Sequence, residues 1–411
     1  MNELTFTLFV RVDQFDGSDT SSCTSFRAKH CMGLHGGEER VCIMLRSKKL
    51  LLCLIVLPTL IASLAFTFGA VHPTRAASAL TSLTDYHIPS GLDPWGTAFD
   101  SSGHVWVAIP GCNPNPDCGN NAGPGKIEEF NPDTLTWTVY PLPSNYGQAL
   151  FLAFDPNGNL WFPMFHTNML GEMVMADKSF HEWQMPTPAS GPWDLVFDSG
   201  KIWITEHFVN KTAEFDPNAL NPNSYNGLGA FVGEVATPAT NSQPYGITVD
   251  ASNNIWFTEN NSAVALIGEI PATTGQLVEY KIRTGSTSNL TPHLITVDPT
   301  GNIWWTEGFA GEIGELNTNN NNTVKEYLYP QTCKGCGTHA SGISVDSNGL
   351  IWFDDSLQNT FGSFPDSGTG TFSMYNAPSS RSHPHDGLRV DSLNRIWFDE
   401  EYAEKLAEAV Q

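Results

Sequence analysis

One pattern recurs seven times along the chain: an aspartate is followed five or six residues later by a tryptophan at the end of a short apolar run. The fullest copy, residues 244–259, reads PYGITVDASNNIWFTE, in which two β-rich segments flank a polar turn. The tryptophans are 55, 42, 53, 48, 48 and 45 residues apart, about the length of one four-stranded propeller blade. The sequence therefore predicts an all-β, seven-bladed β-propeller. The seven pairs are Asp100/Trp106, Asp155/Trp161, Asp198/Trp203, Asp250/Trp256, Asp298/Trp304, Asp346/Trp352 and Asp391/Trp397.

The two ends of the repeat array complement each other. The last copy stops at its third strand, residues 405–410 (KLAEAV), and lacks an outer strand. A segment with the pattern of an outer strand, residues 84–89 (TDYHIP), precedes the first full copy. Because an open ring would leave unpaired strand edges, we expect this N-terminal segment to be the fourth strand of the last blade. The propeller then spans residues 80–411.

The first 79 residues differ in kind from the rest. Arg46, Lys48 and Lys49 precede an apolar stretch at residues 50–71, and the small residues AASA follow at 76–79. This order is typical of a signal peptide, so residues 44–79 are predicted to be one, with Met44 as its start. Residues 1–43 are then a non-native start or an unstructured extension. The alternative is an uncleaved membrane anchor, since the apolar stretch is long enough to span a bilayer. Both alternatives place the propeller outside the cell or at its surface.

The charge balance argues against two classes of partner. The chain has 43 Asp and Glu against 20 Lys and Arg, a net charge of -23. Such a surface repels nucleic acid and anionic lipid, so we expect neither as a partner, and any membrane contact is confined to an uncleaved N-terminal segment. A monomer that binds a small molecule, a peptide or another extracellular ligand is the expected form.

Four cysteines fall within the propeller, in two short loops. Cys112 and Cys118 bracket one loop, and Cys333 and Cys336 form a CKGC motif. In an exported protein such pairs are expected to form local disulfides. A zinc site made of all four thiolates is the alternative, because both loops should emerge on the same face.

Blade geometry predicts where a site would lie. The segments that enter the inner strands and those that leave the second strands should converge at one mouth of the central channel. The second strands of five successive blades end in a carboxylate, and such oxygen ligands suit Mg²⁺, with Ca²⁺ as the alternative. A purely structural role, in which each carboxylate accepts hydrogen bonds from backbone amides of the next loop, competes with metal binding. The set is Glu206, Glu259, Glu307, Asp355 and Glu400, of which the last four are the predicted metal ligands.

Repeats of this type, with IGxI-like third strands, resemble the virginiamycin B lyase (streptogramin B lyase) family from residue 84 to the end of the chain. The resemblance implies a seven-bladed propeller that opens cyclic depsipeptides by β-elimination with Mg²⁺. The family has two histidine motifs, Pro-His-Ala-Ile-Thr and Glu-Pro-His-Gly-Ile. Residues 291–296 (TPHLIT) are similar to the first and place one histidine at His293. Residues 383–388 (HPHDGL) are similar to the second and place the other at His385.

The chain departs from the family pattern in three ways. His383 stands where the family has a glutamate, and Asp386 is an additional residue that should shift His385 relative to its strand. The two motifs also lie in blades five and seven, with blade six between them. In that blade Ser341 takes the aligned position and His339 lies two residues before it.

The expected mechanism combines these residues. A metal ion near Glu307, Asp355 or Glu400 would polarise a substrate carbonyl, and an imidazole would remove the adjacent proton. His385 is the first candidate for this base and His293 the second, and the imidazole of this pair that is not the base would orient metal or substrate. His383 is the third catalytic candidate. Two alternatives remain open: a non-catalytic extracellular propeller that binds a protein or glycan, and, with less support, a gluconolactonase-like hydrolase.

Overall fold

The structure is a computed structural model of the chain, and it describes residues 42–44, 53–55, 79–89, 93–111, 125–143, 147–282 and 290–411. The chain divides into two units, Met1–Pro73 and Thr74–Gln411. In the first unit, β1 (Cys42–Met44) pairs antiparallel with β2 (Cys53–Ile55). Most of the predicted leader lies outside the described residues, so its boundaries stay predictions. No helix in the described part of the chain is long and apolar enough to cross a membrane.

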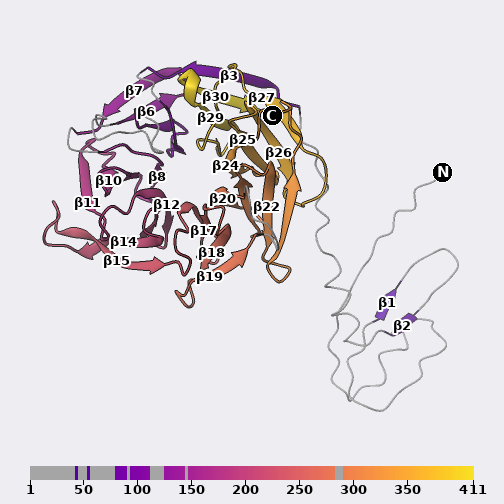
Figure 1. The fold of residues 1–411 in the computed structure, drawn as a ribbon, viewed down its shortest axis with the longest axis horizontal. Coiled ribbons are helices and arrows are strands. Elements are labelled where there is room, and N and C mark those ends of the chain that lie inside the picture. The colour runs from indigo at the N-terminus through magenta and orange to yellow at the C-terminus, as the bar shows by residue number, and fades with distance from the viewer. Residues whose placement is uncertain are drawn as a thin grey trace, which may run out of the picture. The chain divides into compact units, whose positions relative to one another are not determined.

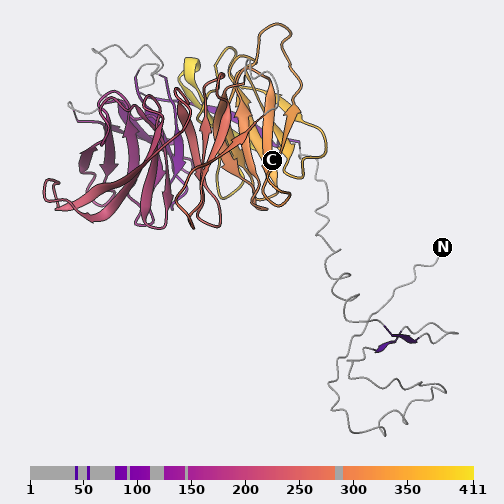
Figure 2. The same ribbon diagram turned by 60° about the horizontal axis from the view of Figure 1, so that its bottom comes forward.

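The second unit is a ring of seven four-stranded antiparallel sheets around a central channel (Figures 1 and 2). The only helical element among the described residues is the short 3-10 helix η1 (Glu401–Ala403). Alternating apolar residues on the short strands bury both faces of each sheet against its neighbours, which is how a propeller builds its core. The predicted seven-bladed β-propeller is confirmed.

The strands follow the order expected from the repeat, from the channel outward in each blade. Blades 1 to 3 are β4 (Thr97–Phe99), β5 (Val105–Ile109), β6 (Lys126–Asn131) and β7 (Thr136–Pro141); β8 (Ala153–Phe154), β9 (Leu160–Met164), β10 (Met169–Met173) and β11 (Phe180–Gln184); β12 (Pro192–Asp198), β13 (Lys201–Glu206), β14 (Lys211–Leu220) and β15 (Leu228–Ala236). Blades 4 to 6 are β16 (Pro244–Val249), β17 (Ile255–Glu259), β18 (Leu266–Ile270) and β19 (Val278–Lys281); β20 (Pro292–Val297), β21 (Ile303–Glu307), β22 (Glu312–Asn317) and β23 (Thr323–Leu328); β24 (Ala340–Val345), β25 (Leu350–Asp355), β26 (Thr360–Pro365) and β27 (Ser373–Asn376). Blade 7 is β28 (Arg389–Val390), β29 (Ile396–Glu400), β30 (Lys405–Val410) and β3 (Ser82–His87).

The N-terminal strand closes the ring, as predicted. β3 pairs with β30 over six residue pairs, from Ser82 opposite Val410 to His87 opposite Lys405. The strand begins and ends two residues earlier than the segment inferred from the sequence. Its Tyr86 ring lies 4.6 Å from the Phe130 ring of blade 1, measured between centroids, so the closing strand also packs across the seam between the first and last blades.

The recurring aspartate and tryptophan have a structural function. In six blades the tryptophan indole N–H donates a hydrogen bond to the aspartate that ends the inner strand, at 2.9–3.2 Å. The same aspartate accepts backbone N–H bonds from the turn, for example from Thr300 and Asn302 at Asp298. Blade 3 has one residue fewer between Asp198 and Trp203, and no such bond forms there among the described residues. We call this unit the hairpin clamp.

A second set of hydrogen bonds joins neighbouring blades next to the channel. Thr205, Thr258 and Thr306, in the second strands of blades 3 to 5, each donate to a backbone carbonyl in the inner strand of the following blade, at 2.6–2.7 Å. In blade 6 the equivalent Asp354 instead accepts from Ser341 and Gly342 of its own inner strand. These bonds fix the inner strands of neighbouring blades against one another and so hold the mouth of the channel in place.

Candidate functional site at the channel mouth

Six aromatic side chains form a closed ring around the mouth of the channel. Neighbouring ring centroids are 4.7–6.4 Å apart all the way round. Half of the ring is indole and phenol, and the other half is imidazole. The members, in order, are Trp95, Trp193, Tyr245, His293, His339 and His385, from blades 1, 3, 4, 5, 6 and 7.

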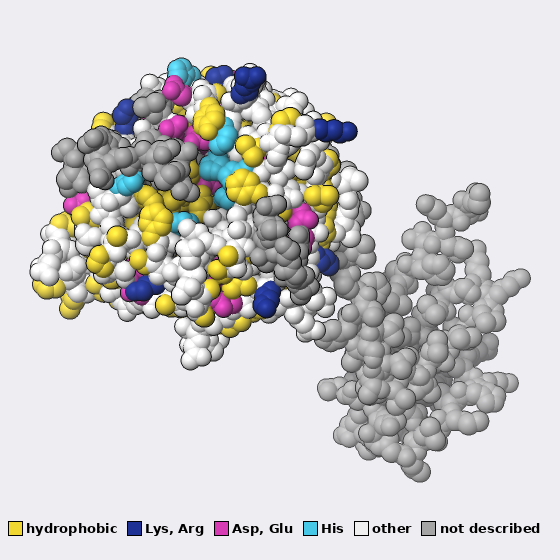
Figure 3. Space-filling model, in the orientation of Figure 1, with side chains coloured by type: hydrophobic (Ala, Val, Ile, Leu, Met, Phe, Trp, Pro, Cys, Tyr) yellow, Lys and Arg dark blue, Asp and Glu magenta, His cyan; other side chains and the backbone are white. Residues whose placement is uncertain are grey.

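The three imidazoles come from neighbouring blades and lie in direct contact. One nitrogen of each lies within 4.8 Å of the corresponding nitrogens of the other two. The Nε2 atoms of His293 and His339 are 3.1 Å apart. Figure 3 shows histidine side chains gathered in the hollow at the centre of this face. The structure therefore brings together His293 and His385, which were predicted, and His339, which was not a predicted site residue. We call these three residues the imidazole cluster.

His293 is held by its own strand and by a glycine. It is the second residue of β20, and its Nδ1 lies 2.7 Å from the carbonyl oxygen of Thr291. A carbonyl only accepts, so Nδ1 carries the proton and Nε2 faces the cluster as a lone pair. Gly308 makes room for the ring, because a Cβ at this position would lie 2.7–2.8 Å from imidazole atoms of His293.

His339 enters the cluster from the residue before β24 rather than from the strand itself. Its Nδ1 lies 3.1 Å from the Ser356 hydroxyl, and its other face stacks on Phe309 with a centroid distance of 4.7 Å. In the neighbouring blade the position aligned with His293 is Ser341, so alignment of the repeats does not point to His339. The sequence signal that could have indicated it is a third histidine at a strand entrance of the blade between the two motifs.

His385 lies outside the inner strand of its blade, as expected from the additional residue Asp386. β28 is only two residues long, and both His383 and Asp386 have a positive φ, near 55°. Asp386 reaches across the channel to blade 4, where it accepts a hydrogen bond of 2.5 Å from the Tyr245 hydroxyl. His385 is 8% exposed, and its buried Nδ1 has no hydrogen-bond partner among the described residues.

His383 lies beside the cluster rather than in it. Its Nδ1 is 2.5 Å from a carboxylate oxygen of Glu401, and its ring stacks on Tyr402 with a centroid distance of 4.3 Å. The His383 and His385 ring centroids are 5.4 Å apart. His383 is thus paired with a carboxylate supplied by η1, a residue that sequence reasoning did not select.

The surroundings keep the imidazole cluster uncharged near neutral pH. Burial lowers the pKa of His293, and it lowers the pKa of His339 and of His385 well below the ordinary value. For the last two, the neighbouring imidazoles add to the effect, because a second positive charge nearby is unfavourable. Neutral imidazoles are the form that can accept a proton or bind a metal ion.

The predicted metal carboxylates do not converge. Glu259 lies beside Glu279, and burial followed by that neighbouring carboxylate raises its pKa to about 8. Glu307 accepts a hydrogen bond from Trp305. Asp355 accepts backbone N–H bonds of 3.0 Å from His339 and Gln358, and Glu400 accepts one of 2.9 Å from Ser379. These bonds are the ones expected if the two carboxylates have a purely structural role.

This arrangement does not fit a Mg²⁺ ion held by those residues. Mg²⁺ requires oxygen ligands in a near-octahedral arrangement. Within the described ranges, only two groups place three potential ligand atoms within 4.8 Å of one another, and neither contains Glu259, Glu307, Asp355 or Glu400. Their assignment to a metal stays a prediction, and no chemical step is assigned to Mg²⁺ below.

The second of these two groups is structural. In blade 1, His104 Nδ1 lies 2.6 Å from Glu129 and 3.6 Å from Asp100. In the last blade, Arg395 bridges the equivalent Asp391 and Glu408, at 2.6 and 3.2 Å. His104 therefore occupies in blade 1 the position that Arg395 occupies in the last blade. It lies between the clamp aspartate and a glutamate of the third strand, where it stabilises the blade.

One of the two predicted cysteine pairs is confirmed. Cys333 and Cys336 form a disulfide with a Cα–Cα distance of 5.6 Å. Gln358, which follows β25, holds this loop by bonding the backbone of Cys333. Cys112 and Cys118 lie outside the described residues. With Cys333 and Cys336 oxidised, the alternative of a four-thiolate zinc site is not formed here.

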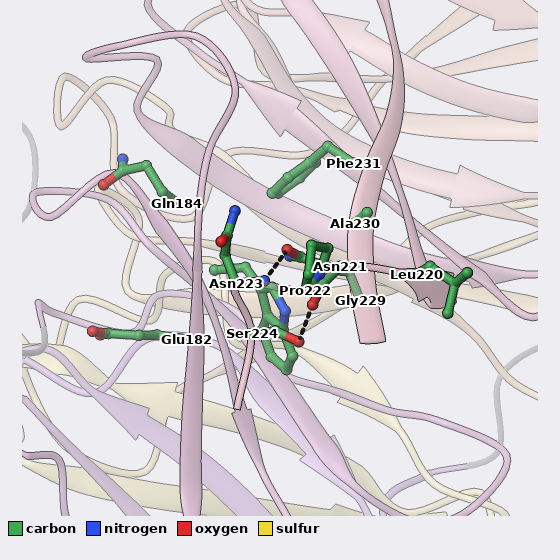
Figure 4. A pocket seen from close by; sticks show the side chains of 11 residues that line it. Glu182, Gln184, Leu220, Asn221, Pro222, Asn223, Ser224, Gly229, Ala230 and Phe231 are labelled. Carbon is green, nitrogen blue, oxygen red and sulfur yellow. Dashed lines mark hydrogen bonds between the residues drawn. The ribbon is translucent and has the colours of Figure 1, made fainter. Parts of the chain in front are cut away.

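A second concave surface lies away from the channel. The long hairpin of β14 and β15 extends blade 3, and a cavity of about 420 Å³ lies between it and β11 of blade 2. Its lining includes Glu182, Trp183, Leu220, Asn221 and Phe231 (Figure 4). No group of three potential metal ligands occurs there among the described residues. The cavity offers a surface for a ligand.

Comparison with known proteins identifies the same family as the histidine motifs. Residues 227–411 match the model of the virginiamycin B lyase family. No match is found among curated protein sequences.

Solved structures with a similar fold cover the whole propeller. Virginiamycin B lyase from Staphylococcus aureus is 24% identical, with a TM-score of 0.65 over 80% of this chain and 99% of that chain. A catalytically inactive histidine-to-alanine variant of the same enzyme with quinupristin is 23% identical, with a TM-score of 0.65 and the same coverage. YCF48 bound to a D1 peptide is 13% identical, with a TM-score of 0.58 over 82% of this chain and 99% of that chain. The resemblance seen in the sequence is thus confirmed: the protein is a seven-bladed β-propeller whose residues 227–411 match the virginiamycin B lyase family.

Proposed function

We propose that this propeller is a lyase that opens ester-linked or cyclic peptides by β-elimination at the channel mouth. The observation that carries the proposal is the state of His385, a neutral imidazole on a family-like Pro-His segment, with its buried Nδ1 unpartnered among the described residues. The family match of residues 227–411 supports the reaction class. The inactive histidine variant of the Staphylococcus aureus enzyme supports the need for a histidine in such a reaction.

The reaction needs one base and no water. His385 removes the proton from the α-carbon of the residue that carries the ester on its β-carbon. The electron pair of the broken C–H bond forms the Cα=Cβ double bond, while the Cβ–O bond breaks and its electrons leave with the carboxylate. The proton passes from the imidazolium to the leaving carboxylate or to solvent. The opened product then has the same composition as the cyclic substrate.

The neighbouring residues have distinct roles in this proposal. His293 is the second candidate for the base, and its Nδ1–H bond to the Thr291 carbonyl aims its Nε2 lone pair into the mouth. His383 is a positioning residue, since its bond to Glu401 directs the other ring nitrogen away from η1 and its ring lies beside His385. The aromatic half of the ring, formed by Trp95, Trp193 and Tyr245, is buried and supports the imidazoles, because Trp95 packs edge-on against His385 and Tyr245 against His293.

We include export in the proposal. The basic, apolar and small-residue order of residues 44–79 supports a secreted or surface-anchored propeller. The disulfide between Cys333 and Cys336 is the kind of bond that persists outside the cytosol. Detection of the mature N-terminus by mass spectrometry, after expression of the full chain in an exporting host, tests this. A protein retained in the cytoplasm would contradict it.

A second candidate function is ligand binding without catalysis. It is favoured by His383, which stands at the family's glutamate position, and by the separate cavity between β11 and the β14–β15 hairpin. On this reading the protein keeps the scaffold and binds a peptide or glycan. Tight binding of such a ligand, with no turnover of any depsipeptide, would favour this reading over the lyase.

The test is a turnover assay on a streptogramin B-type depsipeptide, with the product analysed by mass. Elimination leaves the mass unchanged, whereas hydrolysis adds one water. Parallel reactions with EDTA, Mg²⁺ or Ca²⁺ show whether a hard cation assists. Product of unchanged mass supports the lyase, a product heavier by one water supports a hydrolase, and no product contradicts both.

A further inference from the structure

The imidazole cluster has an unusual arrangement of lone pairs. The outer nitrogen of His293 donates to a backbone carbonyl, so its Nε2 has no proton when the ring is neutral. The outer nitrogen of His339 lies 3.1 Å from the Ser356 oxygen, and that hydroxyl in turn lies 3.4 Å from the His339 carbonyl, to which it can donate. In that tautomer His339 Nε2 also carries a lone pair, and in the other tautomer Ser356 donates to Nδ1 and Nε2 carries the proton. In both tautomers the two Nε2 atoms face each other at 3.1 Å.

Two facing lone pairs repel unless a proton or a cation lies between them. A proton on one Nε2 gives a neutral N–H···N bond between two rings, whereas a metal ion binds the lone pairs of both rings and of a third imidazole beside them. A metal ion also suits the geometry, because two imidazole nitrogens bound to one tetrahedral Zn²⁺ at about 2.0–2.1 Å lie about 3.4 Å apart, close to the 3.1 Å between these two Nε2 atoms. The outer bonds to a carbonyl and a hydroxyl are the kind that orient histidine ligands at metal sites.

His385 provides the third ligand. One of its nitrogens lies within 4.8 Å of those of the other two histidines, and its buried Nδ1 has no partner among the described residues. The adjacent Asp386 carboxylate, 3.9 Å from that Nδ1, adds negative charge that favours a cation. Three imidazoles are the ligand set of zinc sites that keep a fourth position open.

We infer that His293, His339 and His385 bind a transition-metal dication of the Zn²⁺ class, and not Mg²⁺ or Ca²⁺. Imidazole nitrogen selects Zn²⁺, Co²⁺, Ni²⁺ or Cu²⁺, whereas Mg²⁺ and Ca²⁺ prefer oxygen. One consequence rests on the proposed function. A metal ion that uses the lone pair of His385 takes it away from proton abstraction, so Zn²⁺ should inhibit the elimination.

The binding experiment is independent of activity. The full chain is freed of metal with EDTA, and Co²⁺ is then titrated in while visible absorption is recorded, followed by Zn²⁺ competition and by isothermal titration with Zn²⁺ or Mg²⁺ alone. We expect one tetrahedral Co²⁺ per chain, displaced by Zn²⁺, and no binding of Mg²⁺. Imidazole ligation gives no intense sulfur-to-cobalt band in the near ultraviolet, so a thiolate site elsewhere is distinguished by that band.

Variants locate the site. His339→Ala and His385→Ala should each weaken Zn²⁺ binding by about 100-fold or more, because residues that merely orient ligands already contribute about 10- to 100-fold. His166→Ala, at an exposed histidine outside the cluster, is the matched control. His339→Gln keeps a polar side chain, and melting curves of all variants verify folding. Unchanged stoichiometry and affinity in folded His339 and His385 variants would overturn the site.

Turnover measurements distinguish a failure of the metal site from a failure of the proposed lyase function. If Zn²⁺ binds and suppresses turnover in the wild type, both stand. If Zn²⁺ binds and turnover continues unchanged, the shared use of His385 is wrong although the metal site stands. If no depsipeptide is turned over, the proposed function fails while the Co²⁺ spectrum still decides the metal site.

Discussion

The two ends of each inner strand differ in how closely the blades repeat one another. Where the strand ends, six blades carry the same hairpin clamp, in which an indole N–H bonds to an aspartate. Where the strand begins, the second residue changes from blade to blade, from Trp193 to Tyr245, His293 and Ser341 in blades 3 to 6. The repeated end holds each hairpin together, and the varied end builds one asymmetric site. Chemistry should therefore be sought where the repeat is broken.

Ring closure should have the largest effect on stability. Deleting residues through Pro89 removes β3, leaves the edge of β30 unpaired and exposes Trp397 and Phe130, which pack near Tyr86. We expect the melting temperature to fall by about 10 °C or more, because the loss of a whole strand removes several kcal/mol and 1 kcal/mol shifts even a domain of 150–250 residues by about 2–4 °C. A matched deletion that ends at residue 79 keeps β3 and should melt like the full propeller. Equal melting of both truncations would refute the closure.

At the mouth, substitution should affect turnover far more than stability. His385→Ala removes the proposed base, and we expect turnover to fall by about 100-fold or more. His293→Ala should also be damaging, because it removes a neighbouring member of the imidazole cluster. His166→Ala, at an exposed histidine of blade 2, should keep nearly full turnover. Steady-state kinetics on a depsipeptide check this, and full activity of His385→Ala would rule out that residue as the base.

At the hairpin clamp, we expect substitution to affect stability far more than turnover. Asp298→Ala leaves the indole N–H of Trp304 and two backbone N–H groups without their acceptor. We expect a loss of about 2 kcal/mol or more in the free energy of unfolding, with turnover at permissive temperature unchanged. Asp198→Ala is the matched control, because blade 3 has no described clamp bond and Asp198 contacts the exposed Ser199. Denaturant unfolding of both variants gives the comparison, and equal losses would show that the clamp adds nothing.

The buried carboxylates near the mouth should give stability a pH dependence. Glu259 has a pKa of about 8 in the folded protein against an ordinary value of 4.5. Between these values the folded state holds a proton that the unfolded chain has lost, so stability falls as pH rises, by at most about 1.4 kcal/mol per pH unit. Glu259→Gln should flatten this slope between pH 5 and 8. An unchanged slope in urea unfolding curves across that range would contradict the assignment.

The fold could be predicted because its signal is repeated and local. Each Asp–Trp pair lies within seven residues, and the missing fourth strand of the last blade indicated the closing strand. The carboxylates show the limit of such reasoning. Glu259 and its neighbour Thr258 lie on opposite faces of β17, and it is Thr258 that bonds to the next blade, while Glu259 lies beside Glu279 of its own blade.

The site could be predicted only in part. Two histidines were found by their motifs, but His339 joins them through a position outside the aligned strand. The bond between Tyr245 and Asp386 joins residues 141 positions apart, and no sequence pattern encodes such a contact. The pairing of His383 with Glu401 likewise depends on η1, the only helical element among the described residues.

Removal of an α-proton by a neutral imidazole at the varied end of the inner strands can be tested in one measurement. A depsipeptide carrying deuterium on the α-carbon of its ester-bearing residue is incubated with the wild-type protein, and the product is analysed by mass. We expect an opened product in which this deuterium has been lost to solvent and no water has been added, formed more slowly than from the unlabelled substrate. A product that retains the deuterium and has gained one water would contradict the claim.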